Sequence, residues 1–89
     1  MSNYTVRIKN SAKPDLKKIK QFSLTAQFQK IVETLKDTPY LPTQSFEKLR
    51  PTQEGRDSRR LNRQHRVVYK VKEEERIVEI YSAWTHYEK

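Results

Sequence analysis

The spacing of the apolar residues changes once along this chain, near Pro42, and this change restricts the fold more than any other feature. Before Pro42, one group of apolar residues recurs at the period of a helix face. The group consists of Leu24, Phe28, Ile31, Val32 and Leu35. After Pro42, apolar and polar residues alternate as in a strand, for example at Val67, Tyr69 and Val71. The pattern predicts a helical first part and a sheet-forming second part.

Two helices are expected in the first part. The first carries an apolar stripe made of Ala12, Leu16 and Ile19. Asn10 or Ser11 is expected to cap this helix, and Ser23 is expected to cap the second. The second helix should stop at Thr38, because a residue that precedes proline is disfavoured in a helix. The short connection between the two helices predicts that they pack antiparallel.

Five strands are expected, one before the helices and four after them. Their expected ranges are 4–8, 44–50, 58–64, 66–72 and 77–84. In the last strand, one side is expected to carry Val78, Ile80, Ser82 and Trp84. The order β-α-α-β-β-β-β predicts an α+β fold, with the N-terminal strand and the helix pair packed on a mainly antiparallel four- to five-stranded sheet. The 89 residues suffice for one small core, so residues 1–89 are expected to form a single domain.

The composition excludes several classes of function. Cysteine is absent, so neither a disulfide framework nor a thiolate metal site can form. Gly55 is the only glycine, which excludes a glycine-rich phosphate loop. No apolar stretch has the length of a membrane span, and the first residues lack the apolar run of a signal peptide. A cytoplasmic location without a membrane partner is therefore expected.

Positive charge dominates the chain and is dense in one segment. The net charge of +8 is typical of a small protein that meets a polyanion or an acidic protein. One short span holds Arg56, Arg59, Arg60, Arg63 and Arg66. Guanidinium groups bind phosphate in a bidentate manner and keep their charge. The imidazole of His86 follows, and imidazole is well suited to proton transfer at neutral pH. These residues suggest binding and cleavage of a phosphodiester, although a solvated charged surface is the simpler alternative.

Four motifs occur in order along the chain. They are Glu47-Lys48-Leu49, Ser58-Arg59-Arg60, His65-Arg66-Val67-Val68-Tyr69 and His86-Tyr87. Together with the element order, they resemble the YoeB/Txe branch of the RelE/ParE toxin superfamily over the whole chain, most strongly from Phe46 onward. The chain departs from the family pattern at three places. Asp57 replaces a frequent aromatic residue, Gln64 replaces a frequent glutamate, and residues 88–89 follow the terminal His-Tyr pair.

The resemblance implies a RelE-like toxin of a bacterial toxin–antitoxin pair that cleaves messenger RNA on the ribosome. By position, Glu47 would be the general base, His86 the general acid and Arg66 the clamp on the phosphate. Further residues that would bind RNA or phosphate are Arg50, Arg59, Arg60 and Tyr87. The implied partners are a YefM-like antitoxin, ribosomal RNA and messenger RNA, and a homodimer is compatible with the family. No cofactor is implied.

Cleavage of RNA without a metal needs a base for the 2′-hydroxyl, fixed positive charge for the phosphorane and an acid for the departing 5′-oxygen. The chain has the residue types for each step, and the upstream product would carry a 2′,3′-cyclic phosphate. It has no paired carboxylates of the kind that hold magnesium, so no metal site is expected. The outward lysines of the first helix are expected to contact ribosomal RNA phosphates. They are Lys13, Lys17, Lys18 and Lys20.

Each candidate also has a purely structural interpretation. Glu47 could be an exposed strand carboxylate that forms an ordinary salt bridge with Arg66. His86 could be a surface histidine. His65 could transfer protons, but a packed, hydrogen-bonded histidine is the favoured interpretation. Two aromatic residues could stack on bases, although core packing is favoured for both. These are Tyr81 and Trp84.

Two other functions stay open from the sequence. A toxin of the same fold that poisons gyrase would bind a protein and would not need Glu47, Arg66 and His86 together. A non-enzymatic RNA-binding module would keep the arginines but would be indifferent to His86.

Overall fold

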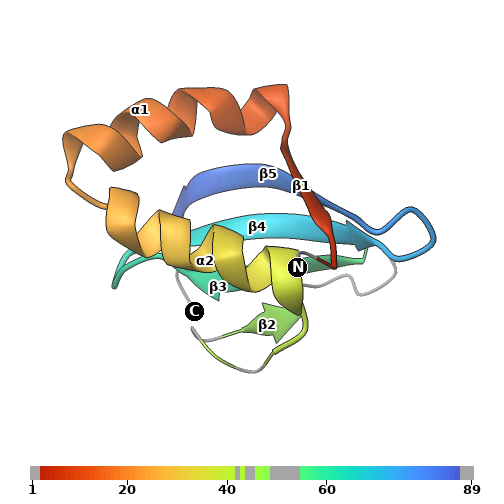
Figure 1. The fold of residues 1–89 in the computed structure, drawn as a ribbon. Coiled ribbons are helices and arrows are strands. Elements are labelled where there is room, and N and C mark those ends of the chain that lie inside the picture. The colour runs from red at the N-terminus through yellow and green to blue at the C-terminus, as the bar shows by residue number, and fades with distance from the viewer. Residues whose placement is uncertain (1–2, 42, 44–45, 49–54, 87–89) are drawn as a thin grey trace.

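A computed structural model describes residues 3–41, 43, 46–48 and 55–86, with Thr85 and His86 described by their backbone alone. The elements follow the order β-α-α-β-β-β-β, with a short 3₁₀ turn before the first helix (Figure 1). The 3₁₀ turn is Asn10–Ala12, and the helices are α1 (Lys13–Gln21) and α2 (Thr25–Asp37). The strands are β1 (Thr5–Ile8), β2 (Glu47–Lys48), β3 (Arg56–Arg60), β4 (His65–Lys72) and β5 (Ile77–His86).

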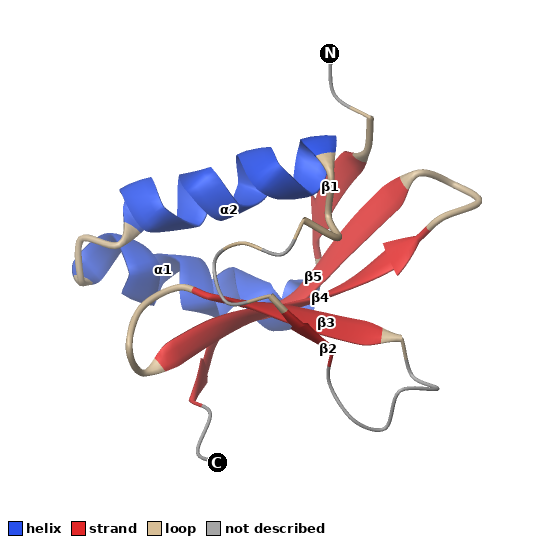
Figure 2. Cartoon of the chain, turned by 90° about the horizontal axis from the view of Figure 1, so that it is seen from below, coloured by secondary structure: helices blue, strands red, loops and turns tan. Residues whose placement is uncertain are grey.

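The strands form one mixed sheet in the order β1-β5-β4-β3-β2. β1 runs parallel to β5, and every other neighbouring pair is antiparallel. The two helices run in opposite directions and lie on the same side of the sheet (Figures 1 and 2). This arrangement confirms the predicted α+β fold with its helix pair on a mainly antiparallel sheet.

The core lies between the helices and one face of the sheet. The helices contribute Ile19, Phe28, Ile31 and Leu35. The sheet contributes Val67, Tyr69, Val78, Ile80 and Ala83. These residues confirm the apolar helix stripes and the strand alternation that the sequence predicted. No helix in the described part of the chain has the length and apolarity needed to cross a membrane.

The predicted helix caps, Asn10 or Ser11 for α1 and Ser23 for α2, are wrong. The 3₁₀ turn puts Ala12 at the N-cap of α1, and the hydroxyl of Ser11 donates instead to the carbonyl of Tyr81, at 2.7 Å. Ser23 has a positive φ of 58° in the turn between the helices, and Leu24 takes the N-cap position of α2. Ser11 therefore joins the 3₁₀ turn to β5, and Ser23 lies within the turn between the helices, so neither serine caps a helix.

The strand boundaries differ from prediction at the end of β3 and in the extent of β2. β3 ends at Arg60, four residues earlier than predicted, because Asn62 turns the chain. The side-chain oxygen of Asn62 accepts from the backbone N–H groups of Gln64 and His65, at 2.9 and 2.8 Å. Of the strand predicted over 44–50, residues 46–48 are described, and Glu47–Lys48 form β2.

The alternation in β5 breaks after Ile80. The register with β4 shifts around Val68, so that Val68 lies opposite Ser82 while Tyr69 lies opposite Ile80. Ala83 is consequently fully buried, whereas Ser82 and Trp84 are half-buried. The prediction that Val78, Ile80, Ser82 and Trp84 share one side is therefore wrong at Ser82, because a bulge adds residues to one strand only.

A polar network joins the β4–β5 turn to the start of β1 and the end of α2. The hydroxyl groups of Tyr4 and Tyr40 both donate to the Glu73 carboxylate at 2.8 Å. Arg76 forms an ion pair with the same carboxylate at 3.3 Å. The hydrogen bonds from Tyr4 and Tyr40 lower the pKa of Glu73 below its usual value.

Candidate active site

The face of the sheet turned away from the helices gathers four polar residues from β2, β3 and β4. Glu47 lies opposite Ser58, and Arg60 lies opposite Arg66. Residues directly opposite each other in antiparallel strands share a face of the sheet. The register therefore brings Glu47, Ser58, Arg60 and Arg66 to one surface, although they come from three separate motifs.

Arg66 is the centre of this group. Arg66 is 6% exposed, and its Nε donates to the Ser58 hydroxyl at 2.8 Å. Its Nη2 lies 3.7 Å from Oε2 of Glu47, which is an ion-pair distance longer than a hydrogen bond. The Glu47 side chain remains 42% exposed. A fixed, buried cation thus lies beside a carboxylate that solvent, or a substrate, can reach.

One predicted residue extends this surface, and the backbone of a second lies close to it. Arg60 is exposed and adjacent to Arg66 across the β3–β4 pair. The backbone of His86 lies in β5 opposite His65, next to the pair of Arg66 and Thr85. The end of β5 therefore runs along the strand that carries Arg66. The predicted sites at Arg50 and Tyr87 lie outside the described residues.

Arg59 lies on the opposite face from its neighbours Ser58 and Arg60, inside the protein. It is fully buried, and its Nη1 and Nη2 donate to the carbonyls of Thr43 and Pro39, at 2.8 and 2.7 Å. Its guanidinium also lies 5.0 Å from the centre of the Phe46 ring. This geometry does not support the predicted contact between Arg59 and phosphate. Because successive side chains of a strand point to opposite faces, the sequence Ser58-Arg59-Arg60 in a strand predicts that Arg59 faces away from the other two.

The sequence matches the model of the YoeB-like toxins of bacterial type II toxin–antitoxin systems over residues 12–87. The chain belongs to this family. Among curated proteins, no sequence matches it. The resemblance inferred from the four motifs is therefore confirmed at the level of the family.

Solved structures of YoeB-like toxins have the same fold. The YoeB dimer from Staphylococcus aureus is 25% identical, with a TM-score of 0.81, and the alignment covers 97% of this chain and all of that chain. A YoeB/ParE toxin from Agrobacterium tumefaciens is 22% identical, with a TM-score of 0.81 and coverage of 93% and 99%. The S. aureus YoeB–YefM heterotetramer is 25% identical, with a TM-score of 0.76 and coverage of 94% and 98%.

In this YoeB-like toxin, Arg59 anchors the segment that leads to Glu47. Its two carbonyl acceptors and the Phe46 ring all precede Glu47 in the chain. The hydroxyl of Tyr69 donates to the same Pro39 carbonyl at 2.9 Å. Arg59 and Tyr69 thus fix the approach to β2 from the core side. The sequence analysis did not identify this role, nor the contact of Ser58 with Arg66.

Asp57, which departs from the family pattern, is buried in β3 and lies opposite Tyr69. Burial raises the pKa of its carboxyl group, and the charges of Lys48 and Arg59 offset part of this effect. Burial likewise raises the pKa of the Tyr69 phenol. An ionised Asp57 is therefore less favourable here than in water.

The ring of His65 packs against Trp84 instead of joining Glu47 and Arg66. The two ring centres are 4.0 Å apart, with an angle of 19° between the planes. This contact agrees with the favoured interpretation of His65 as a packed residue. Tyr81 also has local partners, since it lies 5.1 Å from the Arg56 guanidinium and donates to Glu79 at 3.2 Å.

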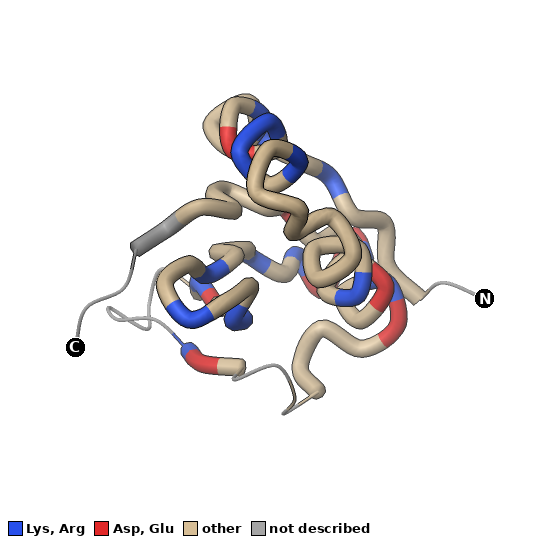
Figure 3. Tube along the Cα trace, turned by 90° about the vertical axis from the view of Figure 1, so that its left-hand side faces the viewer, with Lys and Arg blue, Asp and Glu red and all other residues tan. Residues whose placement is uncertain are grey.

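The predicted lysine surface is present on α1. All four side chains are exposed, and Figure 3 shows Lys and Arg in blue along the upper helix, which is α1. They are Lys13, Lys17, Lys18 and Lys20. This helix packs against β5, so its basic face points away from the sheet.

Proposed function

We propose that this YoeB-like toxin is an endoribonuclease that cleaves messenger RNA on the ribosome. The observation that carries the proposal is the placement of Arg66, which Ser58 fixes at 2.8 Å and which lies 3.7 Å from the accessible carboxylate of Glu47. A buried guanidinium provides fixed positive charge where a pentavalent phosphate would form. A neighbouring carboxylate provides a proton acceptor within reach of a 2′-hydroxyl.

In the proposed reaction, Glu47 takes the proton from the 2′-hydroxyl, and the resulting oxygen attacks the adjacent phosphorus. Arg66 and Arg60 stabilise the negative charge of the phosphorane. His86 donates a proton to the departing 5′-oxygen as the phosphorus–oxygen bond breaks. The products are a 2′,3′-cyclic phosphate and a free 5′-hydroxyl.

We further propose that an acidic antitoxin of the YefM type neutralises the protein. The related S. aureus YoeB forms a heterotetramer with YefM. The net charge of +8 favours a partner of opposite sign, which would cover the surface of Glu47 and Arg66. The S. aureus toxin is also known as a dimer, so the proposal includes self-association of the free toxin.

The lysines of α1 are the proposed contact with ribosomal RNA, and the proposed location is the cytoplasm, where ribosomes are found. A small protein has little surface with which to hold a single strand in reactive geometry. In this proposal the ribosome presents the messenger, and α1 supplies charge that is not specific to sequence.

The decisive experiment is primer extension on messenger RNA from cells in which the chain is briefly induced. We expect new 5′ ends inside coding regions, at positions set by the reading frame. Glu47→Gln should abolish these ends while the protein accumulates normally. Growth arrest by both the wild type and the Glu47→Gln variant, without new 5′ ends in messenger RNA, would contradict the proposal. Inhibition of DNA supercoiling in the same cells would then indicate the gyrase-poisoning alternative.

A further inference from the structure

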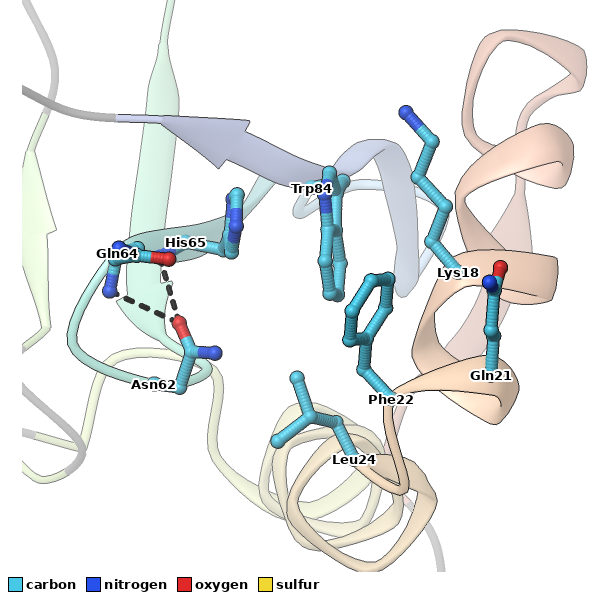
Figure 4. A pocket seen from close by; sticks show the side chains of 8 residues that line it. All are labelled: Lys18, Gln21, Phe22, Leu24, Asn62, Gln64, His65 and Trp84. Atoms are coloured by element: carbon cyan, nitrogen blue, oxygen red, sulfur yellow. Dashed lines mark hydrogen bonds between the residues drawn. The ribbon is translucent and has the colours of Figure 1, made fainter.

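A pocket of about 610 Å³ opens at one end of the sheet, apart from Glu47 and Arg66. It lies between the turn that joins the two helices and the turn that joins β3 to β4 (Figure 4). Consecutive residues of a strand point to opposite faces of the sheet. His65 lines this pocket, whereas the next residue, Arg66, contacts Glu47. The pocket is therefore on the helix side, and the candidate active site is on the other side.

Three aromatic rings form a stack along the pocket wall. The Trp84 ring lies between His65 and Phe22 (Figure 4). Its centre is 4.0 Å from that of His65 and 5.4 Å from that of Phe22, with interplanar angles of 19° and 30°. Phe22 is the outermost ring, and it is 59% exposed. The stack therefore ends in an aromatic ring with enough exposed surface to contact a further flat ring.

The polar residues around the stack favour an anionic ligand whose edges carry hydrogen-bond donors and acceptors. Lys18 and Gln21 project from α1 beyond Phe22, while Asn62 and Gln64 lie on the other side of the pocket (Figure 4). No carboxylate lines the pocket in the described residues. Amide groups can pair with the edges of a nucleobase, and an ammonium group can pair with its phosphate.

We propose that this pocket binds one unpaired nucleobase of ribosomal RNA, stacked on Phe22, with the adjoining phosphate at Lys18. Stacking on an aromatic ring beside a cation is the usual way in which proteins hold unpaired bases. Lys18 belongs to the same basic helix surface as Lys13 and Lys17, so a ligand here is continuous with that surface. A messenger strand at Arg66 would occupy the other face, which favours ribosomal RNA as the source. The inference rests on the proposed action at the ribosome.

The first test measures binding to vacant ribosomes without messenger or antitoxin. Phe22→Ala and Phe22→Leu should each weaken binding by on the order of tenfold, as removal of a base-stacking ring does. Phe22→Tyr keeps the ring and should bind like the wild type. Lys18→Gln should lower the salt dependence by about one unit, while the Phe22 variants should leave it unchanged. Because Phe22 is largely exposed, all variants should keep the wild-type melting temperature.

The second test probes ribosomal RNA bases with a base-modifying reagent. One base should be protected by the wild type and by Phe22→Tyr, but not by Phe22→Ala. Equal binding by Phe22→Leu and the wild type would overturn the proposal, because an aliphatic side chain cannot stack. Loss of antitoxin binding instead of ribosome binding in Phe22→Ala would also overturn it, in favour of a peptide.

A third outcome separates a messenger base from a ribosomal one. If Phe22→Ala binds vacant ribosomes normally but cleaves different codons, the base belongs to the messenger and the proposal fails. If Phe22-dependent protection is seen in a protein that cleaves no messenger, the inference stands and the proposed nuclease function fails.

Discussion

Arg59 and Arg66 are two buried arginines of one sheet, and they lie on opposite faces with different partners. Arg59 contacts backbone carbonyls and an aromatic ring in the core. Arg66 contacts a hydroxyl and a carboxylate at the edge of solvent. The face of the strand on which an arginine lies, and not the density of arginines, decides whether its guanidinium can contact a substrate. Arg59 stabilises the loop before Glu47, whereas Arg66 is placed to contact a ligand that approaches Glu47.

The largest expected effect belongs to the face of Arg66. Glu47→Gln and His86→Gln should each slow single-turnover cleavage on ribosomes by about 10²–10⁴-fold, the usual contribution of a general base or acid. Arg66→Ala should cost at least about 10²-fold, because the phosphorane loses its fixed charge. Time-resolved cleavage on programmed ribosomes measures these rates.

A substrate with a 5′-thio leaving group separates the two proton transfers. Such a group leaves without protonation, so it should restore the rate of His86→Gln but not that of Glu47→Gln. Rescue of both variants, or of neither, would show that the acid and base assignments are wrong. Ribosome binding by both variants serves as the control and should stay at the wild-type level.

The next effect belongs to the opposite face and concerns stability. Arg59→Ala should lower the free energy of unfolding by about 3 kcal/mol, because two charge-assisted hydrogen bonds to backbone carbonyls are lost. The matched control is Arg60→Ala, whose exposed side chain should change it by no more than about 0.5 kcal/mol. Urea unfolding measures both. Equal stability of the two variants would remove the distinction between the faces.

A smaller effect on rate is expected at Ser58, which orients Arg66. Ser58→Ala removes the acceptor of the Arg66 Nε, so cleavage should slow by roughly tenfold, the equivalent of about one hydrogen bond to a charged group. Ribosome binding should not change. An unchanged cleavage rate would indicate that Glu47 and the strand alone hold Arg66 in place.

The smallest effect concerns pH and compares Asp57 with Glu73. The folded state raises the pKa of Asp57, so the ionised wild type is penalised above that pKa and relieved below the unfolded pKa. Asp57→Asn should therefore be more stable than the wild type at neutral pH, and the difference should shrink as the pH falls through the raised value. Urea unfolding at a series of pH values measures this.

Glu73→Gln is the control of opposite sign. The folded state lowers the pKa of Glu73, so its carboxylate stabilises the fold above the unfolded pKa and loses this effect as the pH falls through the lowered value. Glu73→Gln should thus be less stable than the wild type at neutral pH. If both variants shift stability in the same direction, net charge rather than local environment controls the effect.

The sequence predicted the features that depend on periodicity. The helix stripes, the buried alternation at Val67 and Tyr69, and the element order all follow from side-chain spacing. The meeting of Glu47 and Arg66 also followed, through the resemblance to the toxin family. Family motifs locate residues along the chain but do not report which face each residue takes.

The sequence did not predict features that depend on tertiary alternatives. Serine is a frequent helix cap, but Ser11 donates to a carbonyl of β5, and Ser23 lies in a turn with a positive φ. The bulge that buries Ala83 has no local signal. The stack of Phe22, Trp84 and His65 joins three distant segments, and it is a consequence of the fold rather than of any motif.

The strand order also determines when the core of the protein can be completed. β5 lies between β1 and β4, so the strand made first has its described partner in the strand made last. During synthesis, β1 and the helices have no complete sheet to pack on until Ile77 and the residues after it have emerged. Pairing between such distant segments is slow to form. A protein with this topology therefore completes its core only when β5 has joined the sheet between β1 and β4.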